Sequence, residues 1–92
     1  MGSSKNTHVY YTDSARKDLK KINPSVARKI TSKIQIKTQS SPLQTAQALR
    51  GIFLGLYRYR IGSYRAIFRF DERGKIYIVT ILKIKHRKNI YK

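Results

Sequence analysis

The spacing of apolar residues changes about halfway along this chain, from a helical period to an alternating one. Two stripes with helical spacing come first, and Asn23 and Pro24 between them are typical of a helix N-cap and a first helical residue. A short β-favouring run, Val9–Tyr11, precedes both stripes, and Thr12, Asp13 and Ser14 after it offer side-chain oxygens suited to a helix N-cap. The pattern therefore predicts an N-terminal strand followed by an αα-hairpin. The apolar positions of the two helices are Ala15, Leu19 and Ile22, then Ala27, Ile30 and Ile34.

Alternation from Leu56 onward predicts a meander of antiparallel strands. Gly62 and Ser63 suit a two-residue hairpin turn, and a longer connection that contains Gly74 follows the second strand. With 92 residues the chain has room for one hydrophobic core. The expected fold is therefore α+β, with an N-terminal strand and an αα-hairpin packed on a small, mainly antiparallel sheet. The strands of the meander are expected at residues 56–61, 64–70 and 76–85, and the second connection at residues 71–75.

The segment between the two halves has a weaker pattern. Thr38–Pro42 is a polar break, and Leu43–Leu49 favours a further helical turn that ends at Arg50 and Gly51. At the N-terminus, Met1–Ser4 is typical of an expression scar. We therefore expect a single domain over residues 5–92.

Charge is the most unusual property of the composition. Lysine and arginine number 21 against four acids, a formal net charge of +17, which is typical of a chain that binds a polyanion or an acidic partner. The longest apolar run, Ile76–Leu82, is far shorter than the roughly 20 residues of a transmembrane helix. A polar N-terminus without an apolar signal segment and the lack of cysteine favour a cytoplasmic location. We expect a partner among nucleic acids, with RNA favoured, and no membrane association.

A turn at Gly62 and Ser63 determines which residues face each other in the first hairpin. Arg60 then lies opposite Arg65, and the alternating arginines share the face that points away from the helices. Pairing Phe70 with Ile76 across the second connection predicts a core face of Ile76, Ile78, Thr80, Leu82 and Ile84, and it adds two lysines to the arginine face. The predicted cationic face contains Arg58, Arg60, Arg65, Arg69, Lys83 and Lys85.

Nothing nearby in the sequence neutralises this face. Residues 19–70 contain no carboxylate, and like charges opposite one another on a sheet are unfavourable by up to roughly 1 kcal/mol. A single exposed arginine is ordinary, but a cluster of this kind favours an anion-binding role. Phosphate suits it best, because the planar guanidinium matches phosphate oxygens.

The residue types exclude several kinds of chemistry. Two histidines and four scattered acids offer no plausible metal site and no carboxylate pair, and Gly51 and Gly55 lack the spacing of a nucleotide-binding loop. We therefore expect no metal and no cofactor. Metal-free RNA cleavage by the 2′-hydroxyl remains possible, since it needs only a base, cations for the transition state and an acid for the leaving 5′-oxygen.

Two residues are candidates for the base. Arginine stays protonated and is better suited to charge stabilisation, whereas neighbouring positive charges favour the neutral form of Lys85. His86 can exchange a proton near neutral pH. In a regular strand, however, His86 falls on the core side and reaches the cationic face only if the strand ends or bulges there. The sequence does not choose between Lys85 and His86.

The basic tail, residues 85–92, follows the longest strand. It is either a frayed terminus or a docked segment, and Ile90 and Tyr91 are large apolar groups that would gain by docking. A docked tail would bring His86, Arg87 and Tyr91 beside the arginines. Tyr91 could then stack on a base or donate a proton.

Three motifs, Leu49–Gly51, Tyr57–Arg65 and His86–Tyr91, together with the order of strand, basic helical hairpin and meander, carry a family resemblance. The chain resembles the RelE toxins of type II toxin–antitoxin modules, within the RelE/ParE superfamily, over nearly its whole length. The resemblance implies a metal-independent mRNA endonuclease that enters the A site of the 70S ribosome and cuts the mRNA there. It also implies a cognate antitoxin that silences the toxin, with DNA contacted only through that antitoxin.

The resemblance further implies a role for each matching residue. Well-studied RelE enzymes carry lysines where this chain has Arg58 and Arg60, and one of those lysines is considered the general base. Either Lys85 or His86 substitutes for it here, or the enzyme is slower and relies on charge stabilisation. The candidate catalytic residues are Arg60, Arg65, which would contact the scissile phosphate, Lys85, His86 and Tyr91, which would stack in the A site. The candidate RNA-binding residues are Arg58, Arg69, Lys83, Arg87 and Lys88.

Two other functions fit parts of the sequence. A ParE-like toxin shares the fold, binds DNA gyrase and does not cut RNA; the cationic cluster and the terminal tyrosine favour the nuclease instead. An RNA-binding module without activity is the third possibility, since charge alone would suffice for it.

Overall fold

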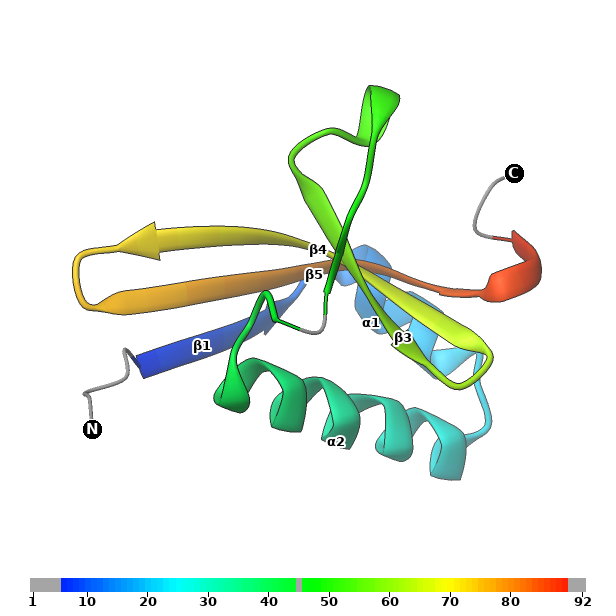
Figure 1. The fold of residues 1–92 in the computed structure, drawn as a ribbon. Helices are drawn as coiled ribbons and strands as arrows, with labels where there is room; N and C mark the ends of the chain where they lie inside the picture. The colour runs from blue at the N-terminus through cyan, green and yellow to red at the C-terminus, as the bar shows by residue number, and fades with distance from the viewer. Residues whose placement is uncertain (1–5, 45, 90–92) are drawn as a thin grey trace.

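The computed structural model describes residues 6–44 and 46–89, which form one sheet with two helices (Figure 1). The sheet has five strands in the order β1-β5-β4-β3-β2, with β1 parallel to β5 and the other pairs antiparallel. The predicted α+β class is confirmed. The elements are β1 (Asn6–Tyr11), α1 (Asp13–Lys20), α2 (Pro24–Ser40), β2 (Gln47–Ala48), a 3₁₀ turn (Gly51–Phe53), β3 (Leu56–Ile61), β4 (Tyr64–Arg73), β5 (Ile76–His86) and a second 3₁₀ turn (Arg87–Asn89).

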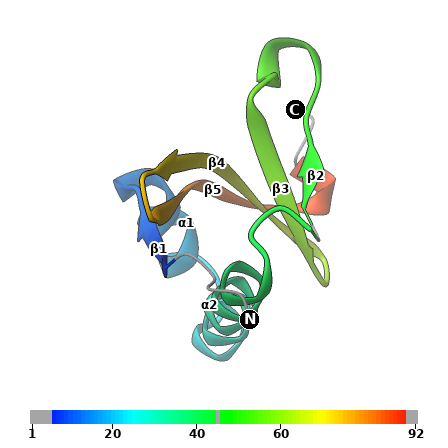
Figure 2. The same ribbon diagram turned by 60° about the vertical axis from the view of Figure 1, so that its left-hand side comes forward.

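Both helices lie on one side of the sheet and form the core with it (Figure 2). This is the packing that the apolar stripes predict. Ile30 and Ile34 of α2 are buried, and Leu19 and Ile22 pack partly buried against the same cluster. None of the helices in the described part of the chain is long and apolar enough to cross a membrane. The buried apolar residues are Ala15, Ile30, Ile34, Tyr59, Ile61, Ala66, Phe68, Val79, Ile81 and Ile84.

The helix starts follow the capping chemistry of the sequence. The Thr12 hydroxyl accepts a hydrogen bond from the Ala15 N–H at 3.1 Å, and Asn23 Oδ1 accepts one from the Ser25 N–H at 2.9 Å. Pro24 occupies the first helical position of α2. Both helices of the predicted αα-hairpin therefore begin where their capping residues predict.

The hairpin of β3 and β4 has the predicted register. Arg60 pairs with Arg65 and Tyr59 with Ala66, and Gly62 supplies the positive φ of the turn, at 59°. The arginines of both strands therefore share the face away from the helices, which we call the open face.

The predicted pairing of the next hairpin was wrong. Phe70 pairs with Val79 instead of Ile76, and both strands continue to a two-residue turn at Gly74 and Lys75. A tight turn lets Asp71, Glu72 and Arg73 pair, whereas their polarity had suggested a loop. As a result Ile76 is 38% exposed, and Val79 and Ile81 take the core positions.

A β-bulge then exchanges the two faces of β5. Phe68 pairs with Ile81 and Ile67 with Lys83, so Leu82 is an extra residue without a partner of its own on β4. Beyond it the core residue is Ile84, which is 3% exposed. Lys83 and Lys85 thus lie on the open face as predicted, but the bulge rather than regular alternation puts them there.

The segment that connects the helices to the meander also differs from the prediction. α2 continues through Thr38, whose hydroxyl donates to the Ile34 carbonyl at 2.9 Å and so needs no other polar partner. The expected helical turn over residues 43–49 is absent from the described residues of that segment, where Gln47 and Ala48 pair with β3 instead. The edge of β3 offers backbone hydrogen bonds that a short helical turn could not use. The connection from β2 to β3 projects away from the helices (Figure 1).

Candidate functional site

Three cations form a continuous row across the open face. Arg60 pairs with Arg65, and Arg65 pairs with Lys85, so the row crosses β3, β4 and β5 beside the β3–β4 turn. Directly paired residues on an antiparallel sheet have Cβ atoms about 5 Å apart. We call Arg60, Arg65 and Lys85 the cationic row. Its spacing suits a single phosphate group that receives hydrogen bonds from more than one strand.

Arg65 is oriented by the turn itself. Its Nη1 donates to the carbonyl oxygens of Gly62 and Tyr64, both at 2.9 Å. Both bonds are to neutral carbonyl acceptors, and they hold the guanidinium in place beside the turn.

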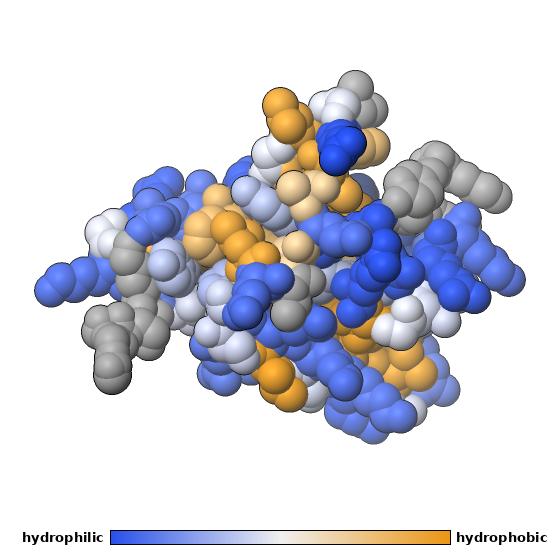
Figure 3. All heavy atoms as spheres, in the orientation of Figure 1, coloured by the Kyte–Doolittle hydropathy of each residue, from blue (hydrophilic) through white to orange (hydrophobic). Residues whose placement is uncertain are grey.

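A second row lies one step further along the strands and contains Arg58, Ile67 and Lys83. Arg58 Nε donates to Gln47 Oε1 at 2.9 Å, and Lys83 Nζ donates to Ser14 Oγ at 2.9 Å. The amide and the hydroxyl thus orient these two cations. Hydrophilic residues cover most of the surface visible in Figure 3.

Arg69 lies on the same face but in a different environment. It pairs with Leu56 and Thr80, and its Nε is 3.5 Å from Asp71 Oδ2. Both side chains are about half exposed, so the ion pair is weak but still offsets part of the charge. Arg69 is therefore less suited to bind phosphate than the cationic row.

His86 lies on the opposite face of the sheet from Lys85. It pairs with Tyr64, which pairs with the buried Ile61, and the Tyr64 and His86 rings meet edge to face with centroids 5.2 Å apart. The His86 Nδ1 accepts a hydrogen bond from the Lys88 N–H at 3.2 Å. His86 would reach the cationic face only if the strand ended or bulged at this residue. The bulge lies earlier in β5, at Leu82, and it places Lys85 on the cationic face instead.

The described part of the basic tail, which ends at residue 89, lies against the β3–β4 turn. The Arg87 N–H donates to the Ser63 carbonyl at 2.7 Å, and Arg87–Asn89 forms a 3₁₀ turn. Arg87 and Lys88 are exposed. Tyr91 lies outside the described residues.

Gln47 is a neighbour of the site that the sequence pattern did not indicate. It belongs to β2 and contacts Arg58, but its segment had been predicted as helical. A Gln opposite an Arg becomes apparent only when the pairing of β2 with β3 is known. Among residues 6–44 and 46–89, no three His, Asp or Glu side chains lie close enough together to hold a metal ion.

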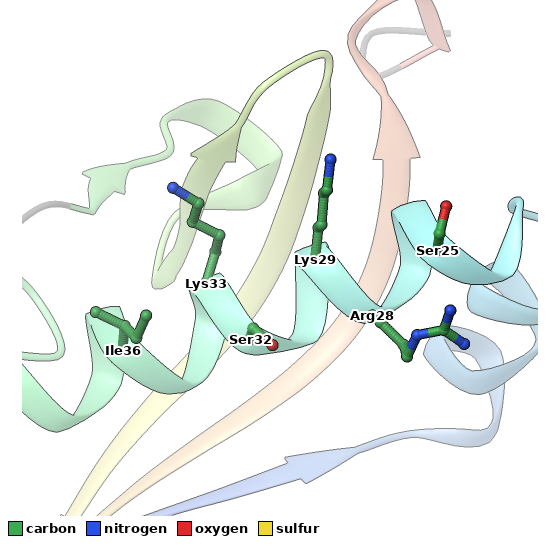
Figure 4. A pocket seen from close by; sticks show the side chains of 6 residues that line it. All are labelled: Ser25, Arg28, Lys29, Ser32, Lys33 and Ile36. Atoms are coloured by element: carbon green, nitrogen blue, oxygen red, sulfur yellow. The ribbon is translucent and has the colours of Figure 1, made fainter.

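A second basic surface lies on the outer side of α2. Lys29 and Lys33 project from the helix toward one side of a shallow hollow and Arg28 toward the other (Figure 4). This hollow is on the helix side of the molecule and is separate from the cationic row. Its full lining is Ser25, Arg28, Lys29, Ser32, Lys33 and Ile36.

Solved structures with this fold include toxin–antitoxin complexes. The toxin–antitoxin complex RelBE2 from Mycobacterium tuberculosis contains a chain with a TM-score of 0.74 and 25% identity, covering 92% of this chain and 100% of that one. An archaeal RelE–RelB complex from Pyrococcus horikoshii contains one with a TM-score of 0.68 and 24% identity, covering 91% and 98%. The fold is therefore that of RelE/ParE superfamily toxins.

Sequence comparison gives the family. Residues 9–91 match the family described as ParE toxin of type II toxin-antitoxin system, parDE. Toxin RelG of Mycobacterium tuberculosis is 31% identical over 84 residues, which cover 91% of this chain and 94% of that toxin. This chain belongs to the ParE toxin family of type II toxin–antitoxin systems, within the RelE/ParE superfamily. The resemblance drawn from its motifs is confirmed.

Proposed function

We propose that this toxin is a ribosome-dependent endoribonuclease that cuts mRNA in the A site without a metal ion. The observation that supports the proposal most directly is the cationic row, in which Arg60, Arg65 and Lys85 lie side by side on three strands. A scissile phosphate bound there would receive charge stabilisation from two guanidinium groups as the transition state forms.

Lys85 is the favoured base. It is next to Arg65 in the row, whereas His86 faces Tyr64 on the other side of the sheet. The base removes the proton from the 2′-hydroxyl, and O2′ attacks phosphorus while the bond from phosphorus to O5′ breaks. A proton donor, for which Tyr91 stays a candidate, protonates O5′. The products are a 2′,3′-cyclic phosphate and a 5′-hydroxyl.

We further propose that a cognate antitoxin silences the toxin. RelBE2 and the archaeal RelE–RelB assembly are both toxin–antitoxin complexes. An open face rich in arginine and lysine is suited to an antitoxin segment that carries carboxylates. Contact with DNA would then occur only through the antitoxin.

The direct test uses ribosomes programmed with an mRNA that has a defined codon in the A site. We expect toxin that has been treated with EDTA to cut within that codon as efficiently as untreated toxin. The cut RNA should carry 2′,3′-cyclic phosphate ends. The magnesium that ribosomes require is kept in the reaction, so chelation is applied to the toxin beforehand.

The family match to ParE toxins supports one alternative, inhibition of DNA gyrase. A supercoiling assay with purified gyrase separates the two activities. Intact mRNA on programmed ribosomes, combined with inhibited supercoiling, would overturn the nuclease proposal.

A further inference from the structure

The start of α1 meets β5 where the neighbouring strand ends. Tyr11 and Ile81 are the last pair of β1 and β5, and the next residue, Thr12, bonds to β5 with both backbone and side chain. Its N–H donates to the Ile81 carbonyl and its hydroxyl donates to the Leu82 carbonyl, both at 3.0 Å. The same hydroxyl accepts the Ala15 N–H and so caps α1.

A second contact lies on the other side of the bulge. Asp18 Oδ2 accepts a hydrogen bond from the Ile84 N–H at 2.9 Å. With β1 already ended, this carboxylate supplies the acceptor that a neighbouring strand would otherwise have offered. Thr12 and Asp18, separated by more than one helical turn, thus bond to β5 before and after the position where it changes faces. We call this pair the α1 clamp.

The bulge decides which face carries the lysines. Ile81 is buried, and regular alternation from it would bury the side chains at 83 and 85 and expose the one at 84. The extra residue Leu82 reverses that order, so Ile84 is buried and Lys85 pairs with Arg65 on the open face. Strand register is prone to slip where little specifies it, and the clamp bonds directly to the carbonyl of Leu82, the extra residue of the bulge.

We propose that Thr12 and Asp18 are positioning residues for Lys85: they fix the bulge at Leu82 and so complete the cationic row. The effect on catalysis rests on the proposed ribonuclease function, while the effect on the strand does not. Asp18 acts through its acceptor oxygen rather than through its charge. A merely stabilising contact would change the amount of folded protein and leave the folded enzyme fully active.

The first experiment tests the clamp in the free toxin, independently of any activity. Amide hydrogen exchange and cross-strand NOEs between residues 65 and 85 are measured by NMR in the parent, Asp18→Ala, Asp18→Asn and Thr12→Val. We expect Asp18→Ala to speed exchange of the Ile84 amide at least tenfold and to weaken the NOEs between residues 65 and 85. Asp18→Asn keeps an acceptor oxygen and should stay within about threefold of the parent. Asp13→Asn, an exposed acid in the same helix, is the matched control and should change neither.

The second experiment measures cleavage by folded protein under single-turnover conditions. Asp18→Ala and Thr12→Val should lower the maximal rate at least tenfold, with a smaller effect on affinity for ribosomes. Thr12→Ser keeps the hydroxyl and should restore most of the rate. The rate of each variant is compared with its folded fraction, measured by circular dichroism. This comparison separates positioning from stability, because a stability effect would scale with the folded fraction.

Deletion of Leu82 supplies a test in the opposite direction. Without this residue, Ile81 and Lys83 would fall on opposite faces by regular alternation, so the lysines no longer need the clamp. In that background Thr12→Val should leave the NOEs between residues 65 and 85 unchanged. If the deletion variant does not fold, the exchange data on Asp18→Ala and Asp18→Asn still decide.

The two proposals fail in different ways. An unchanged Ile84 amide in Asp18→Ala, or full single-turnover activity in that folded variant, would overturn the clamp. A parent protein that cuts no mRNA while Asp18→Ala still loosens Ile84 and the pairing of residue 85 would overturn the proposed function and support the clamp as the device that orders this face.

Discussion

At the scale of single residues, Arg65 is the cation whose setting is best defined. Its guanidinium is held by the Gly62 and Tyr64 carbonyls and lies between Arg60 and Lys85. We predict that Arg65→Ala lowers the rate of mRNA cleavage on the order of a hundredfold, as expected for the loss of one transition-state donor. Stability should change by about 0.5 kcal/mol or less, because the residue is on the open face and faces a like charge.

The control for this prediction is Arg69→Ala. Arg69 is on the same strand and the same face, but it is ion-paired with Asp71 and lies outside the cationic row. The Arg69→Ala variant should cut mRNA at a rate within a few-fold of the parent in the same programmed-ribosome assay. Equal toxicity of Arg65→Ala and the parent would show that the register assigned to the site does not describe the functional surface.

The base can be identified by the dependence of the cleavage rate on pH. A general base works only when deprotonated, so its titration produces the acidic limb of the rate profile. We predict that Lys85→Ala flattens this limb and lowers the rate, while His86→Ala leaves its shape unchanged because His86 faces away from the row. Single-turnover rates on programmed ribosomes across the stable pH range provide the measurement. A limb that is lost in His86→Ala and kept in Lys85→Ala would assign the base to the imidazole.

At the scale of elements, Tyr59 ties the sheet to the end of α2. It is fully buried, stacks on Phe68 with ring centroids 4.4 Å apart, and donates its hydroxyl to the Pro42 carbonyl at 2.7 Å. Tyr59→Phe keeps the ring and leaves that carbonyl unsatisfied. We predict a loss of about 1–2 kcal/mol in the free energy of unfolding at pH 7, and little change in cleavage per folded molecule.

Burial also raises the pKa of the Tyr59 phenol above its ordinary value. The folded state then holds this proton more tightly than the unfolded state, so the contribution is complete below about pH 10 and is lost as pH rises further. The difference in stability between the parent and Tyr59→Phe should therefore be constant up to about pH 9 and narrow progressively as pH rises above about 10. Denaturant unfolding at several pH values checks this, and comparison of the two proteins cancels the titration of the lysines. A constant difference would contradict it.

The elements that local chemistry determines could be predicted from the sequence. Caps at Thr12 and Asn23 and the turn at Gly62 depend on neighbours within a few residues, and the helices and the first hairpin appear where those signals indicate. The faces of β5 could not be derived in the same way. Its bulge depends on the Thr12 hydroxyl, 70 residues away along the chain, and no alternation pattern contains that contact.

The same limit applies to the candidate site. Arg60 and Arg65 could be assigned to one face because a two-residue turn leaves a single register. Which of Lys85 and His86 lies beside the arginines depends on the position of the bulge, and the contact of Gln47 with Arg58 depends on the pairing of β2 with β3. Both depend on tertiary contacts rather than on local propensity.

At the scale of the whole molecule, a charge of +17 makes nonspecific attraction to RNA unavoidable. Specific phosphate contacts can be separated from this background by their salt dependence, because each neutralised phosphate releases counterions. We predict that binding of a 2′-O-methyl RNA, which cannot be cleaved, weakens linearly in a plot of log affinity against log salt. Arg60→Gln should reduce the magnitude of that slope by about 1.

The matched control is Lys75→Gln, at the exposed β4–β5 turn and at the far end of the hairpin from the cationic row. It removes the same unit of net charge, so it should lower affinity slightly through the general field and leave the slope within error of the parent. Fluorescence anisotropy over a range of potassium chloride concentrations measures both variants. Equal changes in slope for Arg60→Gln and Lys75→Gln would mean that RNA senses only the total charge. A change confined to Arg60→Gln would instead assign a phosphate contact to one end of the row, which net charge by itself could never locate.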